Sequence, residues 1–121
     1  MKKIVIFDTS FLINSLRSRR DLIASIEECV GPFLGVVPSA VVEELKKMPK
    51  EVGGPALITA SNFSIYPCAG NYADGCILHL TDKKGWVLAT DDLPLSRQAR
   101  IWGIPVISHS GRKLRFSPVD R

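Results

Sequence analysis

Short apolar runs that alternate with helix-forming segments are the feature that most constrains the fold of this chain. The run Ile4-Val5-Ile6-Phe7 is continuously apolar, which is typical of a strand buried on both faces of a sheet. Similar runs recur along the chain, separated by segments with helical periodicity. Because buried strands that alternate with helices form parallel sheets, we expect a three-layer α/β/α fold around a central, mostly parallel sheet.

Turn and capping residues set the expected bounds of these elements. Asp21 and Ser39 are candidate N-caps, and Gly53-Gly54-Pro55 is expected to form the turn that starts a helix. Pro105 cannot donate to a ladder, so its strand lies at a sheet edge or the proline lies at the start of the strand. Strands are expected at 4–7, 33–37, 63–66, 86–89 and 104–107, with a short terminal strand at 113–116. Helices are expected at 11–16, 22–30, 40–48, 56–60, 72–84 and 95–102.

Length and composition predict one domain over residues 1–121, with 45% hydrophobic and 23% charged residues. The apolar run before Asp8 is too short for a signal peptide. The longest mostly apolar stretch, residues 29–42, is interrupted by Pro32 and Pro38 and is too short to span a bilayer. We therefore expect a cytoplasmic protein that does not associate with membranes.

Three cysteines, Cys29, Cys68 and Cys76, form no C-x-x-C pair and lie at no zinc-site spacing from His79 or His109. We expect all three to be reduced, buried apolar residues. The two histidines are expected on a half-buried or exposed helix face and in a loop, respectively, without a catalytic role.

Acidic residues follow four of the predicted strands. Because the carboxyl ends of parallel strands meet at one edge of a sheet, we expect these side chains to converge. Converging carboxylates repel one another and stay ionised only beside a cation, and their oxygens suit Mg²⁺ or Mn²⁺. Such ions serve phosphoryl transfer. The acids are Asp8, Glu43, Glu44, Asp74, Asp91 and Asp92.

Helical periodicity separates the two adjacent glutamates. Glu43 points away from the apolar face of their helix, whereas Glu44 lies at its border. The apolar face is formed by Val41, Val42, Leu45 and Met48. Glu44 is therefore the better candidate ligand.

Each acid also has a purely structural interpretation, because carboxylates are favoured in the first turn of helices. Asp92 could cap the helix that contains Pro94, and Asp74 could neutralise a helix N-terminus. Thr9 is expected to cap the helix that begins near Phe11. Ser10 could cap it too, or could hydrogen-bond a ligand carboxylate or a metal-bound water.

The acids lie in four segments whose order covers essentially the whole chain. Each segment is weak by itself, but four in order, each on its expected element, are specific. They are Ile6-Phe-Asp-Thr-Ser-Phe-Leu-Ile13, Pro38-Ser-Ala-Val-Val-Glu-Glu-Leu45, Ala73-Asp-Gly-Cys-Ile-Leu78 and Leu88-Ala-Thr-Asp-Asp-Leu93. Together they resemble the acidic motifs of PIN-domain ribonucleases, most closely the branch linked to rRNA processing in archaea and eukaryotes.

The resemblance implies an acidic pocket that binds Mg²⁺ or Mn²⁺ and a protein that hydrolyses RNA phosphodiester bonds. Gly75 departs from the pattern, because the rRNA-processing branch often has a second aspartate there. By position, the catalytic acids are Asp8, Glu44, Asp74 and Asp92. Of these, Asp8, Asp74 and Asp92 would bind the metal, while Ser10 and Asp91 would support them.

Basic residues would contact the phosphates of an RNA substrate without reading its sequence. The net charge of +4, from 16 Lys and Arg against 12 Asp and Glu, is a mild bias towards polyanions. The tail segment 112–115 is a further basic patch. The candidate RNA-binding residues are Arg17, Arg19, Arg20, Arg97 and Arg100.

Two alternatives remain open within the same fold. One is a catalytically silent PIN domain that binds RNA or protein in ribosome assembly. The other is a toxin ribonuclease, whose partner would be an antitoxin. A homodimer is also an expectation, because relatives often dimerise. A phosphoacceptor receiver domain is excluded, because the third strand ends in Pro67-Cys68 and not in an aspartate.

Overall fold

The computed structural model describes residues 2–18, 21–68 and 73–118, without the side chains of residues 73–75. Its strands form one sheet in the order β3-β2-β1-β4-β5-β6. All neighbouring pairs are parallel except β5 and β6, which are antiparallel. The strands are β1 (Lys3–Phe7), β2 (Phe33–Pro38), β3 (Ser64–Tyr66), β4 (Val87–Ala89), β5 (Val106–Ser110) and β6 (Lys113–Ser117).

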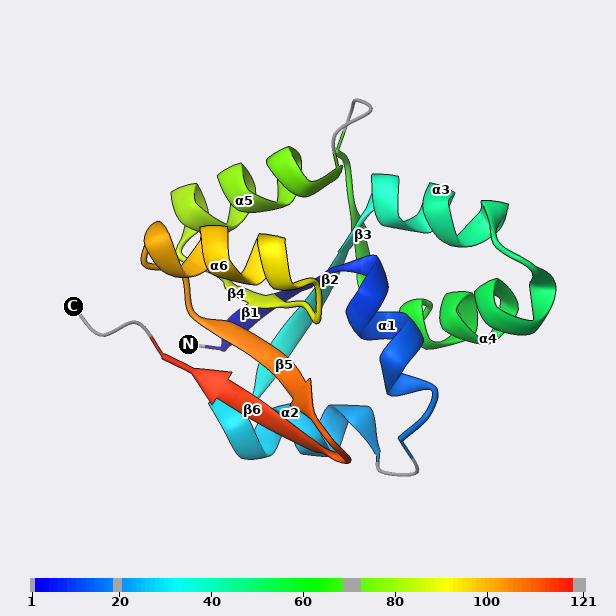
Figure 1. Ribbon diagram of the computed structural model, residues 1–121, viewed down its shortest axis with the longest axis horizontal. Coiled ribbons are helices and arrows are strands. Elements are labelled where there is room, and N and C mark those ends of the chain that lie inside the picture. Colours follow the sequence, from blue (N-terminus) through cyan, green and yellow to red (C-terminus); the bar gives the residue numbers. More distant parts are fainter. Residues whose placement is uncertain (1, 19–20, 69–72, 119–121) are drawn as a thin grey trace.

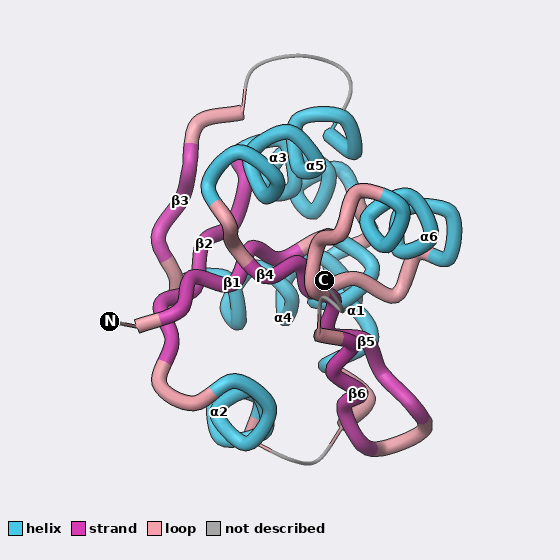
Figure 2. The backbone as a smooth tube through the Cα atoms, turned by 90° about the vertical axis from the view of Figure 1, so that its left-hand side faces the viewer, coloured by secondary structure: helices cyan, strands magenta, loops and turns pink. Residues whose placement is uncertain are grey.

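Helices cover both faces of this sheet. Figure 2 shows α5 and α6 on one side of the central strands and α2 on the opposite side. Figure 1 shows α1, α3 and α4 together beyond the carboxyl ends of β1 and β2. The helices are α1 (Thr9–Ser15), α2 (Leu22–Val30), α3 (Ser39–Lys47), α4 (Lys50–Ala60), α5 (Ala73–Lys84) and α6 (Leu93–Ile101). The expected three-layer α/β fold is confirmed.

The core lies on the central strands, as the apolar runs predict. Val5, Ile6 and Phe7 of β1 are completely buried, because β1 lies between β2 and β4 and helices cover both faces of the sheet. Phe7 stacks on Phe63 with ring centroids 4.5 Å apart. The ring of Phe63 in turn presses against Gly35, where a Cβ would collide with it. This packing fixes the end of β1, and therefore the position of the residue that follows it.

Several expected helix starts are wrong. Helix α4 begins at Lys50 and contains Gly53, Gly54 and Pro55, where the sequence predicts a turn. Ser39 is the first residue of α3 and does not cap it; its hydroxyl instead accepts the backbone N–H of Cys68 at 2.8 Å. Asp21 does cap α2, because its side chain accepts the backbone N–H groups of Ile23 and Ala24. These differences leave the order of the elements unchanged.

The two alternatives for Pro105 are resolved by the sheet order. The strand β5 lies inside the sheet between β4 and β6, so the edge position is wrong. Pro105 precedes the first residue of β5, and its carbonyl accepts the backbone N–H of Leu88 at 3.0 Å. The expected terminal strand is confirmed as β6.

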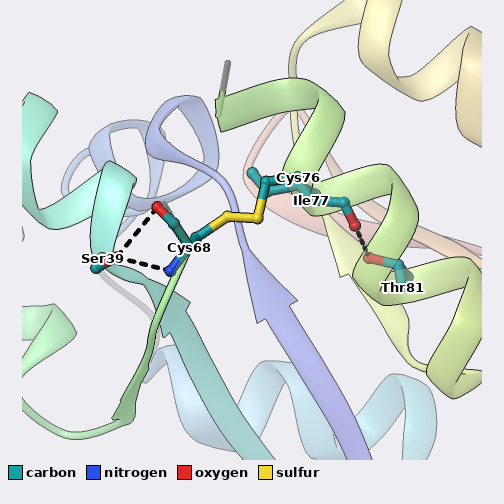
Figure 3. Close-up of a disulfide and its surroundings, with 5 residues drawn as sticks. All are labelled: Ser39, Cys68, Cys76, Ile77 and Thr81. Carbon is teal, nitrogen blue, oxygen red and sulfur yellow. Dashed lines mark hydrogen bonds between the residues drawn. A yellow bond between two sulfur atoms is a disulfide. The ribbon is translucent and has the colours of Figure 1, made fainter. Parts of the chain in front are cut away.

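A disulfide between Cys68 and Cys76 contradicts the expectation of reduced cysteines. Their Cα atoms are 6.2 Å apart, a distance that a disulfide can bridge. Figure 3 shows the bond joining the segment after β3 to the start of α5. Cys29 is free and half-buried. The two cysteines are 8 positions apart, so no C-x-x-C spacing in the sequence indicates their pairing.

Across the described ranges, no helix is long and apolar enough to cross a membrane.

Candidate functional site

Asp8 lies at the carboxyl end of the central strand β1 and is buried, with only 6% of its surface exposed. Its backbone N–H continues the β1–β4 ladder by donating to the Ala89 carbonyl at 3.0 Å. Its side chain accepts the hydroxyl of Ser10 at 2.9 Å and that of Thr90 at 2.7 Å, both on Oδ2. Two hydroxyl groups from different elements thus hold the Asp8 side chain in place at the end of β1.

Thr9 does not cap α1, which corrects the expectation from the sequence. Helix α1 begins at Thr9 itself, with Asp8 at the N-cap position and no side-chain capping bond. The Thr9 hydroxyl instead donates to Oε2 of Glu44 at 2.9 Å. Asp8 and Glu44 are therefore joined through the residue that follows Asp8. Glu43 is exposed and pairs with Lys46, which confirms that it points away.

Asp92 lies at the N-cap of α6, after β4. Its Oδ1 accepts the backbone N–H of Leu95 at 3.0 Å, and its own N–H donates to the Thr90 hydroxyl at 3.1 Å. The capping interpretation of Asp92 is therefore correct. The bond to Thr90 also links Asp92 to Asp8, because both contact the same hydroxyl. Capping α6 with Oδ1 does not prevent Asp92 from also lying beside Asp8.

Each of these three carboxylates uses one oxygen within the protein. Oδ2 of Asp8, Oε2 of Glu44 and Oδ1 of Asp92 accept the bonds described above. In the described residues, the second oxygen of each has no hydrogen-bond partner. Carboxylate oxygens of this kind are suitable ligands for Mg²⁺ or Mn²⁺.

The described side chains do not by themselves form a metal centre. Among them, no group of three or more His, Cys, Asp or Glu residues is arranged to hold an ion. Asp74 lies in the first turn of α5, and its side chain is outside the described part of the chain. Convergence of four acids therefore stays a prediction.

Asp91 forms a pair with His109 that the sequence did not reveal. His109 lies on β5 and not in a loop; its Nδ1 is 2.6 Å from Oδ2 of Asp91, and its backbone N–H donates to Oδ1 at 2.5 Å. The Asn14 amide donates to Oδ2 at 3.1 Å. Both carboxylate oxygens of Asp91 form hydrogen bonds, so its side chain links α1 and β5 to the end of β4.

The electrostatics of Asp91 agree with this structural role. Burial raises the pKa of its carboxyl, but the hydrogen bonds from His109 and Asn14 outweigh burial and hold the pKa below the ordinary value of 3.8. The backbone N–H of Asp91 donates to the Ser10 hydroxyl at 3.1 Å. Asp91 and Asp8 therefore both contact the Ser10 hydroxyl, and the supporting role expected for Asp91 stays a prediction.

The candidate RNA-binding arginines lie on separate elements. Arg17 follows α1 and is exposed, while Arg19 and Arg20 are outside the described residues. Arg97 and Arg100 are exposed on α6, and Arg100 donates to the Ser117 hydroxyl at 3.3 Å. His79 is exposed on α5 with its ring 5.5 Å from that of Trp102, which agrees with a surface role.

A mostly parallel sheet between layers of helices, with a buried aspartate at the end of its central strand, is typical of the PIN-like class. The chain belongs to this family: the family described as "PIN like domain" matches residues 5–112. The resemblance seen in the acidic segments is thereby confirmed.

The curated relatives that match are described as "rRNA-processing protein FCF1 homolog". Those of Homo sapiens, Mus musculus and Bos taurus are each 28% identical over 115 residues, which is 90% of this chain. The chain matches 58% of the length of each. It thus spans little more than half of these relatives.

Two solved structures share the fold. The structure titled "Structure of the PIN domain endonuclease Utp24" superimposes with a TM-score of 0.78 at 28% identity, over 94% of this chain and 90% of that one. A domain of a functionally unknown protein from Methanocaldococcus jannaschii has a TM-score of 0.63 at 19% identity, over 98% of this chain and 99% of that one. The latter shows the fold alone.

Proposed function

We propose that this chain is a divalent-metal-dependent endoribonuclease that acts in rRNA processing. The observation that carries the proposal is the environment of Asp8, a buried carboxylate held by two hydroxyls at the carboxyl end of the central strand. The similarity to a PIN-domain endonuclease and to rRNA-processing proteins supports it.

The proposed ligands of Mg²⁺ or Mn²⁺ are Asp8, Asp74 and Asp92, with Glu44 completing the set directly or through water. When bound, the ion would lower the pKa of an attacking water and stabilise the leaving oxygen of the RNA. The chain's own residues position these acids. Ser10 and Thr90 orient the Asp8 carboxylate, and the cap on α6 orients Asp92.

A module that only binds RNA or protein has no need of a buried aspartate at this edge of the sheet, because burial of an acidic group is costly. We therefore favour catalysis over a silent binding module. The RNA substrate would contact Arg17, Arg97 and Arg100, and a ribosome-assembly protein is the proposed protein partner.

The test is cleavage of labelled single-stranded RNA by the purified chain, with Mg²⁺ or Mn²⁺ and with chelator. We expect cleavage only with the metal, and a loss of roughly a hundredfold or more in Asp8→Asn with an unchanged melting temperature. Asp21→Asn is the matched control, because Asp21 caps α2 and has no place in the site. Full activity of Asp8→Asn would refute the assigned site.

The two adjacent glutamates provide a second matched comparison. Glu44→Gln is expected to reduce cleavage, whereas Glu43→Gln removes an equal charge one residue away and is expected to cleave normally. RNA binding without cleavage by the wild-type chain, at any concentration of either metal, would instead establish the silent binding module.

A further inference from the structure

A cavity of about 300 Å³ lies between the end of α1 and the turn of the β5–β6 hairpin. Two basic segments that are remote in the sequence meet there, one from each side. None of the described residues that line it is acidic. The lining residues are Asn14, Arg17, Ser18, His109, Gly111 and Arg112.

The wall of this cavity is connected to the candidate active site by hydrogen bonds. Asn14 and His109 both bind Asp91, and the backbone N–H of Asp91 donates to the Ser10 hydroxyl. Ser10 in turn donates to the Asp8 carboxylate at 2.9 Å. The cavity wall is therefore linked to Asp8 through Asp91 and Ser10.

The charge of this wall favours an anion. The Asp91 carboxylate beneath it is occupied by the ring and backbone N–H of His109 and by the Asn14 amide. Arg17 and Arg112 are exposed, and neither forms an ion pair with any residue that the structure describes. Two guanidinium groups that have no carboxylate partner in the described part of the chain are suited to a phosphate, which they can bind in a bidentate manner.

We propose that this cavity binds a backbone phosphate of the RNA strand next to the scissile one, with Arg17 and Arg112 as its ligands. This inference rests on the proposed function and names where the substrate strand leaves the acidic site. The second N–H of the Asn14 amide is available to the same phosphate. A phosphate contact of this kind sets the register of the strand and reads no base.

The experiment measures binding of a short single-stranded RNA to the full chain carrying Asp8→Asn, in chelator, at several salt concentrations. Arg17→Gln/Arg112→Gln is expected to weaken binding roughly tenfold or more, and to reduce the slope of log K against log salt by about 0.7, the contribution of one phosphate on a single strand. Lys47→Gln/Lys83→Gln, with the same charge loss on α3 and α5, is expected to change both quantities little.

An RNA with a 5′-hydroxyl distinguishes a backbone phosphate from a terminal phosphate as the bound group. With a 5′-hydroxyl RNA the effect of the arginine pair should persist, whereas its disappearance would mean a terminal phosphate and overturn the proposal. A single neutral methylphosphonate linkage in the RNA, placed next to the cleaved bond, should weaken binding by the chain that keeps Arg17 and Arg112. The same linkage should not further weaken binding by the Arg17→Gln/Arg112→Gln variant.

Failure of this inference is distinguishable from failure of the proposed function. If the wild-type chain cleaves RNA and the arginine pair binds it as the lysine pair does, only the cavity assignment is wrong. If the wild-type chain neither binds nor cleaves RNA, both are wrong.

Discussion

Thr90 donates its hydroxyl to the Asp8 carboxylate at 2.7 Å, although the two residues are 82 positions apart in the chain. The hydroxyl oxygen of Thr90 also accepts the backbone N–H of Asp92 at 3.1 Å. Thr90 is completely buried, so water does not compete for these bonds. One side chain therefore sets the positions of two proposed metal ligands.

Replacement of Thr90 by valine keeps the shape of the side chain and removes the hydroxyl. A buried oxygen of Asp8 then loses a donor, and the Asp92 N–H loses an acceptor. We expect a loss of about 1–3 kcal/mol in the free energy of unfolding, together with reduced RNA cleavage. Chemical denaturation and the cleavage assay measure the two effects.

Thr81→Val is the matched control for this prediction. Thr81 is also buried, but its hydroxyl donates to the Ile77 carbonyl within α5. We expect a smaller loss of stability and normal cleavage. Equal behaviour of the two variants would mean that Thr90 has no special relation to the site.

The strands, the mostly parallel sheet and the acids that follow the strands could be predicted from the sequence, because apolar runs and their alternation with helices are local patterns. Apolar runs mark buried strands, and β1 is buried as its run predicts. The bounds of α4 could not be predicted in the same way. Gly53 opposes helix formation by itself, but it lies so close to the Leu45 carbonyl that a Cβ would collide there. Packing against α3 thus favours a helix where propensity favours a turn.

The pair of Asp91 and His109 was missed for a related reason. The two residues are 18 positions apart on different elements, and only the end of β4 and the position of His109 on β5 bring them together. The same holds for Cys68 and Cys76, whose pairing depends on the path between β3 and α5. Contacts set by the register of neighbouring strands or by chain path leave no spacing signal in one sequence.

The lowered pKa of Asp91 predicts how stability depends on pH. Its pKa in the folded state lies below the ordinary 3.8, so ionised Asp91 stabilises the fold above that pH. This contribution declines as the pH falls below 3.8 towards the folded-state pKa. We expect the difference in unfolding free energy between wild type and Asp91→Asn to shrink below about pH 4.

The measurement is urea denaturation in chelator across this pH range, so that no metal contributes. Asp82→Asn, at an exposed acid on α5, serves as the control and should give a small difference at every pH. If the wild type instead gains free energy of unfolding relative to Asp91→Asn as the pH falls below about 4, the ionised Asp91 side chain does not stabilise the fold by linking α1, β4 and β5.

The disulfide predicts a specific count of thiols. Native protein isolated without reductant should have one reactive thiol per chain, Cys29, and fully reduced, unfolded protein should have three. Cys29 should react slowly at neutral pH, because burial and the charge of Glu28 raise its pKa and lower the thiolate fraction. Thiol titration before and after reduction decides this.

Loss of the Cys68–Cys76 bond should destabilise the fold, because the link restricts the unfolded chain. For so short a loop we expect a loss of about 2 kcal/mol in Cys68→Ser/Cys76→Ser. Cys29→Ser is the control and should leave the bond intact. Three reactive thiols in native protein purified without reductant would show that the bond does not form.

Asp92 has two roles in our interpretation, and two substitutions separate them. The side-chain oxygen of an asparagine can still accept the Leu95 N–H, so Asp92→Asn should keep the cap of α6 and the stability of the fold while losing the charge that binds the metal. Asp92→Ala loses both, and should cost about 1 kcal/mol in addition. Both variants should lose RNA cleavage.

Asp21→Ala removes the cap of α2 alone and should lose stability without losing cleavage. If Asp92→Asn cleaves RNA as the wild type does, Asp92 is a helix cap and nothing more.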